Sequence, residues 1–255
     1  MIRRAWTRIA GGIGVAALVF LASAAFAQGE LVILSVTGLV LDLREGQSVA
    51  AGATIRLPAA STVRLLAASG KVVTVQGPFA GPVPLPDDVK PAESGTQGLA
   101  RLARFLIERP QGTEASLGAV REVSLGAVRL TEPARPSREP SDPWQVVAEE
   151  AGAQCARPPE IVLWRKNAGP AAPYEMRAQP GPSVKAVWPE GEYRQSLRPE
   201  FAVDGMKLQV TLGGRASAIT LHLLPPALTN PVDIANWMLD KGCHRQAALY
   251  LEKLP

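Results

Sequence analysis

Apolar and polar residues alternate through residues 31–75, and this period of two predicts short β-strands. The clearest case is STVRLLAASGKVVTV (61–75), in which two alternating runs flank a Ser-Gly turn and predict a hairpin. LVILSVTG (31–38) indicates an earlier strand. Glycines in REGQSVAAGATIRL (44–57) mark the places where the chain turns back between strands. This part of the chain is therefore expected to be all-β.

The same residues carry a family resemblance. A strand is followed by Gly46-x-x-Val49-x-x-Gly52-x-x-Ile55 and by a hairpin with the run GKVV (70–73). This order resembles the FecR-like periplasmic β-domain over about residues 30–85. The resemblance implies a domain for sensing, scaffolding or cell-envelope contacts, with no catalytic residues. FecR signalling proteins begin with a sigma-factor-regulating segment and a membrane span, which a signal peptide replaces here, so only the domain fold is implied.

A second β-rich region follows from Trp144 to Pro226. Turn sequences separate its strand candidates, which are EIVLWRK, YEMRAQ, SVKAVWP, KLQVTLGG and AITLHLLP. Strands at this spacing fit a small antiparallel β-sandwich. Asn230 and Pro231 then predict a helix start, and Gly242 predicts its end before a second helix. The predicted fold is mainly β: a FecR-like β-domain (28–85) and a β-sandwich with a C-terminal helical hairpin (144–255).

Residues 86–143 are predicted to be a linker that contains one short helix. FAGPVPLPDDVKPAES (79–94) is proline-rich and predicts an extended connector. QGLARLARFLIE (97–108) places three leucines on one helical face, which favours packing on a β-domain over membrane contact. SLGAVR occurs twice within 116–129, which is too few copies for a solenoid, so the role of this duplication stays open.

The first 27 residues have the pattern of a secretory signal peptide, with arginines, an apolar run and the small-residue motif Ala25-Phe26-Ala27. The alternative is an uncleaved membrane anchor, because the apolar run approaches the ~18 residues that a spanning helix needs. Cleavage predicts a periplasmic protein with no stable membrane span. It removes three of the 27 basic residues and leaves 24 against 23 acidic ones, so nucleic-acid binding is not expected.

Cys155 and Cys243 are the two cysteines of the chain, and export into an oxidising compartment predicts a structural disulfide between them. Covalent haem attachment fails because Asp240 stands where Cys-x-x-Cys-His requires a cysteine, and a redox-active pair fails on the same spacing. A nucleophilic dyad of Cys243 with His244 stays open, although neighbours on a helix do not face each other.

Catalytic and metal sites find little support. His222 lies in a predicted strand, no Gly-x-Ser-x-Gly elbow exists, and no His/Cys cluster has zinc-ligand spacing. Two acidic pairs could be imagined as a glycosidase pair, but both lie in turn-like sequence, and they are Asp87 with Asp88 and Glu190 with Glu192. No catalytic residue, metal or cofactor is expected.

Four aromatic residues are the possible binding residues: Trp164, Trp188, Tyr193 and Trp237. Rings beside polar groups can bind a glycan or a partner side chain, although an aromatic core is the commoner use. The expected function is a non-enzymatic cell-envelope binding or scaffold module whose partner is an envelope protein or glycan. The alternatives are a periplasmic sensor that signals to a membrane partner and a cell-wall glycosidase.

Overall fold

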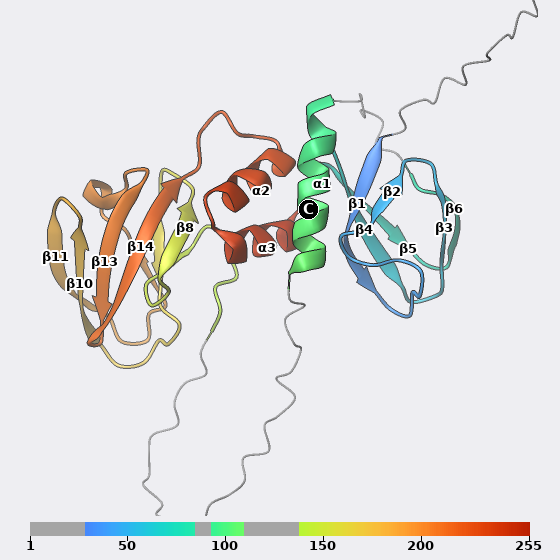
Figure 1. Ribbon diagram of the computed structural model, residues 1–255. Helices are drawn as coiled ribbons and strands as arrows, with labels where there is room; N and C mark the ends of the chain where they lie inside the picture. The colour runs from blue at the N-terminus through green and yellow to red at the C-terminus, as the bar shows by residue number, and fades with distance from the viewer. Residues whose placement is uncertain (1–28, 85–92, 110–137) are drawn as a thin grey trace, which may run out of the picture.

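The computed structural model describes residues 29–84, 93–109 and 138–255. The protein is mainly β, as the sequence predicts, and a layer of three helices lies between two β units (Figure 1). Three of the sequence predictions lie outside the described residues: the signal peptide, the Asp87-Asp88 pair and the duplication at 116–129.

The first β unit contains six strands: β1 (Glu30–Thr37), β2 (Ser48–Ala50), β3 (Thr54–Leu57), β4 (Thr62–Ala67), β5 (Val72–Gln76) and β6 (Phe79–Pro82). They form a four-stranded antiparallel sheet, in the order β2-β1-β4-β5, and a β3-β6 pair. Inward residues of both sheets share one apolar core. The predicted hairpin is confirmed as β4-β5. Residues 79–82 were predicted to begin an extended connector. They form strand β6 instead, because FAGP pairs with β3.

The second β unit contains eight strands: β7 (Val146–Val147), β8 (Gly152–Ala156), β9 (Val162–Trp164), β10 (Ala172–Ala178), β11 (Ser183–Trp188), β12 (Arg194–Ser196), β13 (Met206–Leu212) and β14 (Arg215–Leu223). A five-stranded sheet in the order β11-β10-β13-β14-β8 and a three-stranded sheet, β12-β9-β7, bury a common core. The five predicted strands are all present.

Two strand pairs of this unit are parallel, β8 with β14 and β7 with β9. The antiparallel pattern expected from the sequence does not include them. The antiparallel pairs β10-β11 and β13-β14 are hairpins joined by short turns, whereas β8 and β14 are separated by all the strands between them, so no hairpin fixes their direction. A local sequence pattern therefore predicts the hairpins but not the direction in which sequence-distant strands pair.

The helices are α1 (Glu93–Glu108), α2 (Pro231–Asp240) and α3 (His244–Lys253), and a 3-10 turn covers Pro199–Phe201. The Asn230 side chain accepts a hydrogen bond from the Val232 N–H at 2.8 Å and caps α2, with Pro231 in its first turn, as predicted. Gly242 follows α2 with a φ of +79°, a conformation that glycine adopts without strain. The predicted helical hairpin is thereby confirmed.

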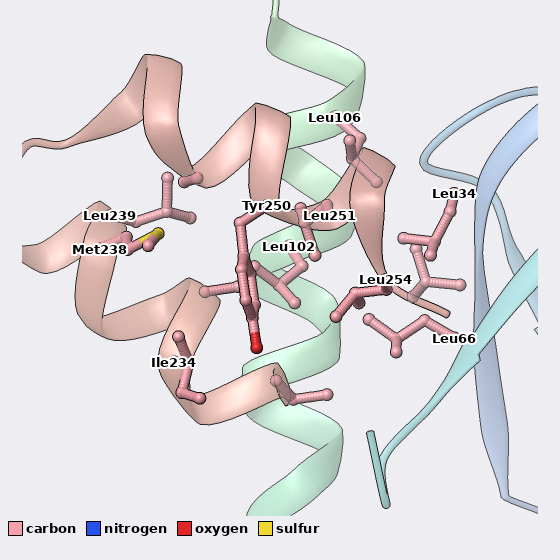
Figure 2. Close-up of a cluster of buried hydrophobic side chains, with 14 of the residues drawn as sticks. Leu34, Leu66, Leu102, Leu106, Ile234, Met238, Leu239, Tyr250, Leu251 and Leu254 are labelled. Carbon is pink, nitrogen blue, oxygen red and sulfur yellow. The ribbon is translucent and has the colours of Figure 1, made fainter. Parts of the chain in front are cut away.

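The three helices share one core with the first β unit. Leu99, Leu102 and Leu106 of α1 are buried, and this core also includes Leu34 of β1 and Leu66 of β4. Figure 2 shows the α2 and α3 side chains that complete it, among them Met238, Tyr250 and Leu251. The predicted packing of the amphipathic helix on a β-domain is confirmed.

A polar contact joins the same two parts of the molecule. The Arg64 guanidinium on β4 donates to the Glu252 carbonyl at 2.8 Å and also to the Leu254 carbonyl. Both carbonyls lie at the end of α3, where the last C=O groups of a helix have no partner within the helix.

No helix within the described ranges is long and apolar enough to cross a membrane.

Candidate functional site

The two cysteines form a disulfide. Cys155 on β8 and Cys243, directly before α3, have Cα atoms 5.9 Å apart and are bonded through sulfur, and both side chains are buried. The bond ties the helical hairpin to β8, the edge strand of the five-stranded sheet in the second β unit. Because both sulfurs are oxidised, neither is free as a thiolate nucleophile, so His244 has no thiol partner.

Three of the four candidate aromatic residues are buried, and two of them, Trp188 and Trp237, lie within apolar cores. Trp188 is fully buried in the sandwich core, meets Tyr174 edge-on at 5.8 Å and donates through Nε1 to the Glu192 carbonyl at 3.0 Å. Trp237 of α2 is buried in the helical core. Neither ring presents a face to solvent, so both have structural environments.

The other two aromatic residues form a stacked pair, Trp164 with Tyr193, whose ring centroids are 5.2 Å apart. Guanidinium groups cover this pair as well: Arg138 lies 5.6 Å from the Tyr193 ring and Arg194 lies 5.6 Å from the Trp164 ring. Cations over aromatic faces gain cation–π attraction. The stack is therefore already engaged by the protein's own arginines.

The carboxylate pair at Glu190 and Glu192 lies in a turn that holds a buried cation. The Arg165 guanidinium donates to four backbone carbonyls at 2.7 to 3.2 Å, those of Gly169, Pro170, Pro189 and Glu192. Burial lowers the pKa of Arg165. The Glu192 carbonyl accepts from both Arg165 and Trp188, so the part that Glu192 plays here is that of a backbone acceptor. The carboxylates of Glu149 and Glu192 both oppose the lowering of the Arg165 pKa, which indicates that they act as counter-charges to a buried cation.

The two histidines have different surroundings. His222 on β14 is largely buried, and its Nδ1 lies 3.9 Å from a carboxylate oxygen of Asp204. Burial, followed by the charge of Lys241, lowers the pKa of His222, although Asp204 opposes this shift. His244 is exposed at the start of α3, with its ring 6.1 Å from that of Phe105. No group of three potential metal ligands occurs among the residues that the structure describes.

A groove with a volume of about 930 Å³ lies between α1 and α3. Its apolar lining comes from Phe105 of α1, Leu239 at the end of α2, Ala248 and Leu249 of α3, and Pro140. Drug-sized ligands commonly occupy hollows of about 300 to 1,000 Å³. The groove is therefore large enough to take several side chains of a ligand.

Charged side chains surround this apolar lining, and α1 carries most of the positive ones. Arg101, Arg104 and Arg109 line the α1 side together with Glu108. Arg101 forms an ion pair with Asp240. The guanidinium groups of Arg104 and Arg109 have no ion pair or hydrogen bond with another described residue. The α1 rim is therefore a cationic edge with two arginines available to a ligand.

The α3 rim is closer to neutral. Arg245 forms a 3.1 Å ion pair with Glu150, and His244 and Glu252 complete this side. Glu139, at the end of the groove, pairs with Lys166 at 3.5 Å. Anionic groups of a ligand are therefore best placed beside α1, and its apolar groups beside α3.

The position of α3 depends on a buried side chain beside the disulfide. Gln246 accepts a hydrogen bond from the Cys155 N–H at 2.7 Å and donates to the Cys155 carbonyl at 2.6 Å. It also donates to the Pro143 carbonyl at 2.7 Å. Together with the disulfide, these bonds fix the first turn of α3, which carries His244 and Arg245 into the groove.

This groove was not predicted from the sequence. The leucine stripe of α1 correctly predicted the buried face of the helix. Phe105 stands beside that stripe and was the one available signal, because a large apolar residue next to arginines widens the apolar face beyond one stripe.

Comparisons of the chain with protein-family models, with curated proteins and with solved structures found no match.

Proposed function

We propose that this protein is an exported, non-enzymatic protein of the bacterial cell envelope that binds a segment of a partner protein in the groove between α1 and α3. The groove carries the proposal, because it combines an apolar lining with a cationic rim on an ordered helical layer. Binding would proceed by surface complementarity, with no bond made or broken.

The charges of the rim argue for the chemistry of the partner. Two arginines without ion-pair partners among the described residues, Arg104 and Arg109, face the groove beside Phe105. Arginine forks bind carboxylates well, and aromatic and arginine side chains dominate binding energy at interfaces. The partner segment should therefore combine apolar side chains with carboxylates that face α1.

The export part of the proposal rests on two features. The N-terminal sequence has the pattern of a signal peptide, and the chain joins Cys155 to Cys243 in a disulfide, the kind of bond that persists in oxidising compartments. A FecR-like assignment of the first β unit is part of the same proposal. It is supported by the glycine and valine pattern that suggested it.

Site-specific photocrosslinking tests the proposed function. Leu249, in the groove, is replaced by the photoreactive residue benzoylphenylalanine in the bacterium that makes the protein, and Gln209 on the exposed sheet face serves as the matched position. We expect one partner protein to crosslink at position 249 and not at position 209. Its crosslinked segment should contain apolar and acidic residues.

A synthetic peptide of that segment then gives the affinity. Arg104→Glu with Arg109→Glu should weaken binding by about tenfold or more, because like charges then face the peptide's carboxylates. Arg215→Glu, an exposed arginine on β14, should leave binding unchanged. The peptide should be recovered with unchanged mass. Crosslinking of position 249 only within the chain itself, no crosslink at all, or cleavage of the peptide would each overturn the proposal.

A further inference from the structure

The two edges of the five-stranded sheet differ in how their backbone groups are used. Strand β8 forms one edge, and there Gln246 makes the hydrogen bonds that a neighbouring strand would make to the Cys155 N–H and C=O. Strand β11 forms the other edge, where the sheet order places no further strand among the described residues. A strand at an edge presents a row of unpaired backbone groups.

The register identifies which residues of β11 carry those groups. The Ala178 N–H bonds the Pro182 carbonyl at 2.8 Å, and in an antiparallel ladder the bonded pairs recur every second residue. Residues 184, 186 and 188 therefore bond β10. On the other side of β10, the Gly213 N–H donates to the Pro173 carbonyl and the Gln179 N–H donates to the Lys207 carbonyl. The odd-numbered residues of β10 therefore bond β13, which leaves the even-numbered ones to bond β11.

Ser183, Lys185 and Val187 consequently direct their N–H and C=O groups away from β10, toward the open edge. Val187 is 60% exposed, and the Lys185 side chain is 79% exposed. Pro182 and Pro189 flank the strand and have no N–H to donate. The edge therefore offers alternating donors and acceptors over a short length, and only another extended polypeptide repeats that spacing.

The charge of this edge is positive. Glu175 on β10 is shared by two cations, Arg177 at 3.0 Å and Lys185 at 3.7 Å, so one positive charge is left over. The hydrogen bond from Arg177 is the main reason that the pKa of Glu175 is lowered. The Glu175 carboxylate is therefore already the acceptor for Arg177. An acidic residue opposite Lys185 would supply the missing negative charge.

A second copy of this chain fits the edge poorly. In a two-fold antiparallel pair that joins all three open residues of each copy, Lys185 lies opposite its own equivalent. Like charges directly opposite each other destabilise a sheet. Lysine on an edge strand is a common guard against self-pairing, and it leaves the edge available to a partner of opposite charge.

We propose that the outer edge of β11 binds an extended acidic segment of a partner polypeptide, which adds to the sheet as a sixth strand beside Ser183, Lys185 and Val187. Backbone hydrogen bonds supply the attachment, and the acidic residue opposite Lys185 supplies selectivity. This surface lies on the second β unit and is separate from the groove between α1 and α3.

The probe is a fluorescein-labelled peptide of alternating threonine and valine with a central glutamate, and its binding is measured by fluorescence anisotropy. In the first derivative, the backbone nitrogens of the central glutamate and of the residues two positions before and after it are methylated. In the second derivative, the backbone nitrogens of the residues directly before and after the glutamate are methylated instead. The first derivative loses the N–H groups that face β11 and should bind at least ~10-fold more weakly, whereas the second should bind within ~3-fold of the parent.

Protein variants test the same contact from the other side. Lys185→Pro removes an outward N–H without removing a bond to β10 and should weaken the parent peptide by ~10-fold. Lys185→Glu keeps the N–H and the fold. It should weaken the glutamate peptide and strengthen a lysine-centred one, whereas Lys253→Glu on α3 should change neither. Equal binding of both methylated derivatives, or self-association that Lys185→Pro abolishes, would overturn the proposal.

Discussion

Gln246 shows how one buried side chain can take the place of a strand. Its amide oxygen accepts from the Cys155 N–H, and its amide nitrogen donates to the Cys155 and Pro143 carbonyls. Gln154 makes a similar pair of bonds to the N–H and C=O of Val147, at 2.6 and 2.9 Å. Two glutamines therefore satisfy backbone groups that short or edge strands leave unpaired in the interior.

Gln246→Leu should lower the free energy of unfolding by about 3 kcal/mol, because it leaves the buried Cys155 N–H and C=O without partners. Denaturant unfolding measures this loss. Gln209→Leu, on the exposed face of β13, serves as the control and should change stability by less than about 0.5 kcal/mol. A loss for Gln246→Leu as small as that of the control would show that water replaces these bonds.

At the scale of the elements, α1 and α2 approach closely at a glycine. A Cβ atom on Gly98 would lie 2.9 Å from Asn236 Nδ2 and 3.0 Å from Val232 Cγ1. The absence of a side chain also lets the Asn236 amide donate to the Gly98 carbonyl at 3.2 Å. The glycine therefore sets the distance between two helices that lie far apart in the sequence.

Gly98→Leu should destabilise the protein by about 2 kcal/mol, because the new side chain has to displace Asn236 and Val232. Thermal unfolding followed by circular dichroism measures the effect. Ala100→Leu adds the same side chain to the exposed face of α1 and is the matched control. If both variants had equal stability, the close approach at Gly98 would not limit helix packing.

The sequence predicted those elements whose pattern is local. Alternating runs located β4, β5, β10, β11, β13 and β14, and the Asn230-Pro231 start and Gly242 stop located α2. Strands β7, β8 and β12 have five residues or fewer, and their pairing partners lie elsewhere in the chain, so no local period marks them. The groove was missed for the same reason, because its walls come from residues more than a hundred positions apart.

At the scale of the whole molecule, the disulfide joins residues 88 positions apart and ties the helical hairpin to the second β unit. A cross-link over such a loop stabilises the folded state by removing conformational freedom from the unfolded chain. Arg64 makes the corresponding attachment on the other side, from the first β unit to the end of α3. Helix α3 is thus held at both of its ends.

The double substitution Cys155→Ala and Cys243→Ala should lower the free energy of unfolding by about 4.5 kcal/mol, the value expected for a loop of this length. Equilibrium unfolding in guanidinium chloride measures it, with the oxidised parent protein as reference. Reduction of the unfolded parent protein, followed by refolding under reducing conditions, should reproduce the loss. A double variant as stable as the parent would mean that the unfolded chain is constrained by other means.

The helical layer brings together residues that are far apart in the chain. Leu102 of α1 is covered by Tyr250, Leu251 and Leu254, which follow it by more than 140 positions (Figure 2). A chain in which α3 has not yet docked therefore exposes the apolar face of α1. An exposed apolar surface of this kind favours association between incompletely folded chains, so the docking of α3 protects the protein against aggregation.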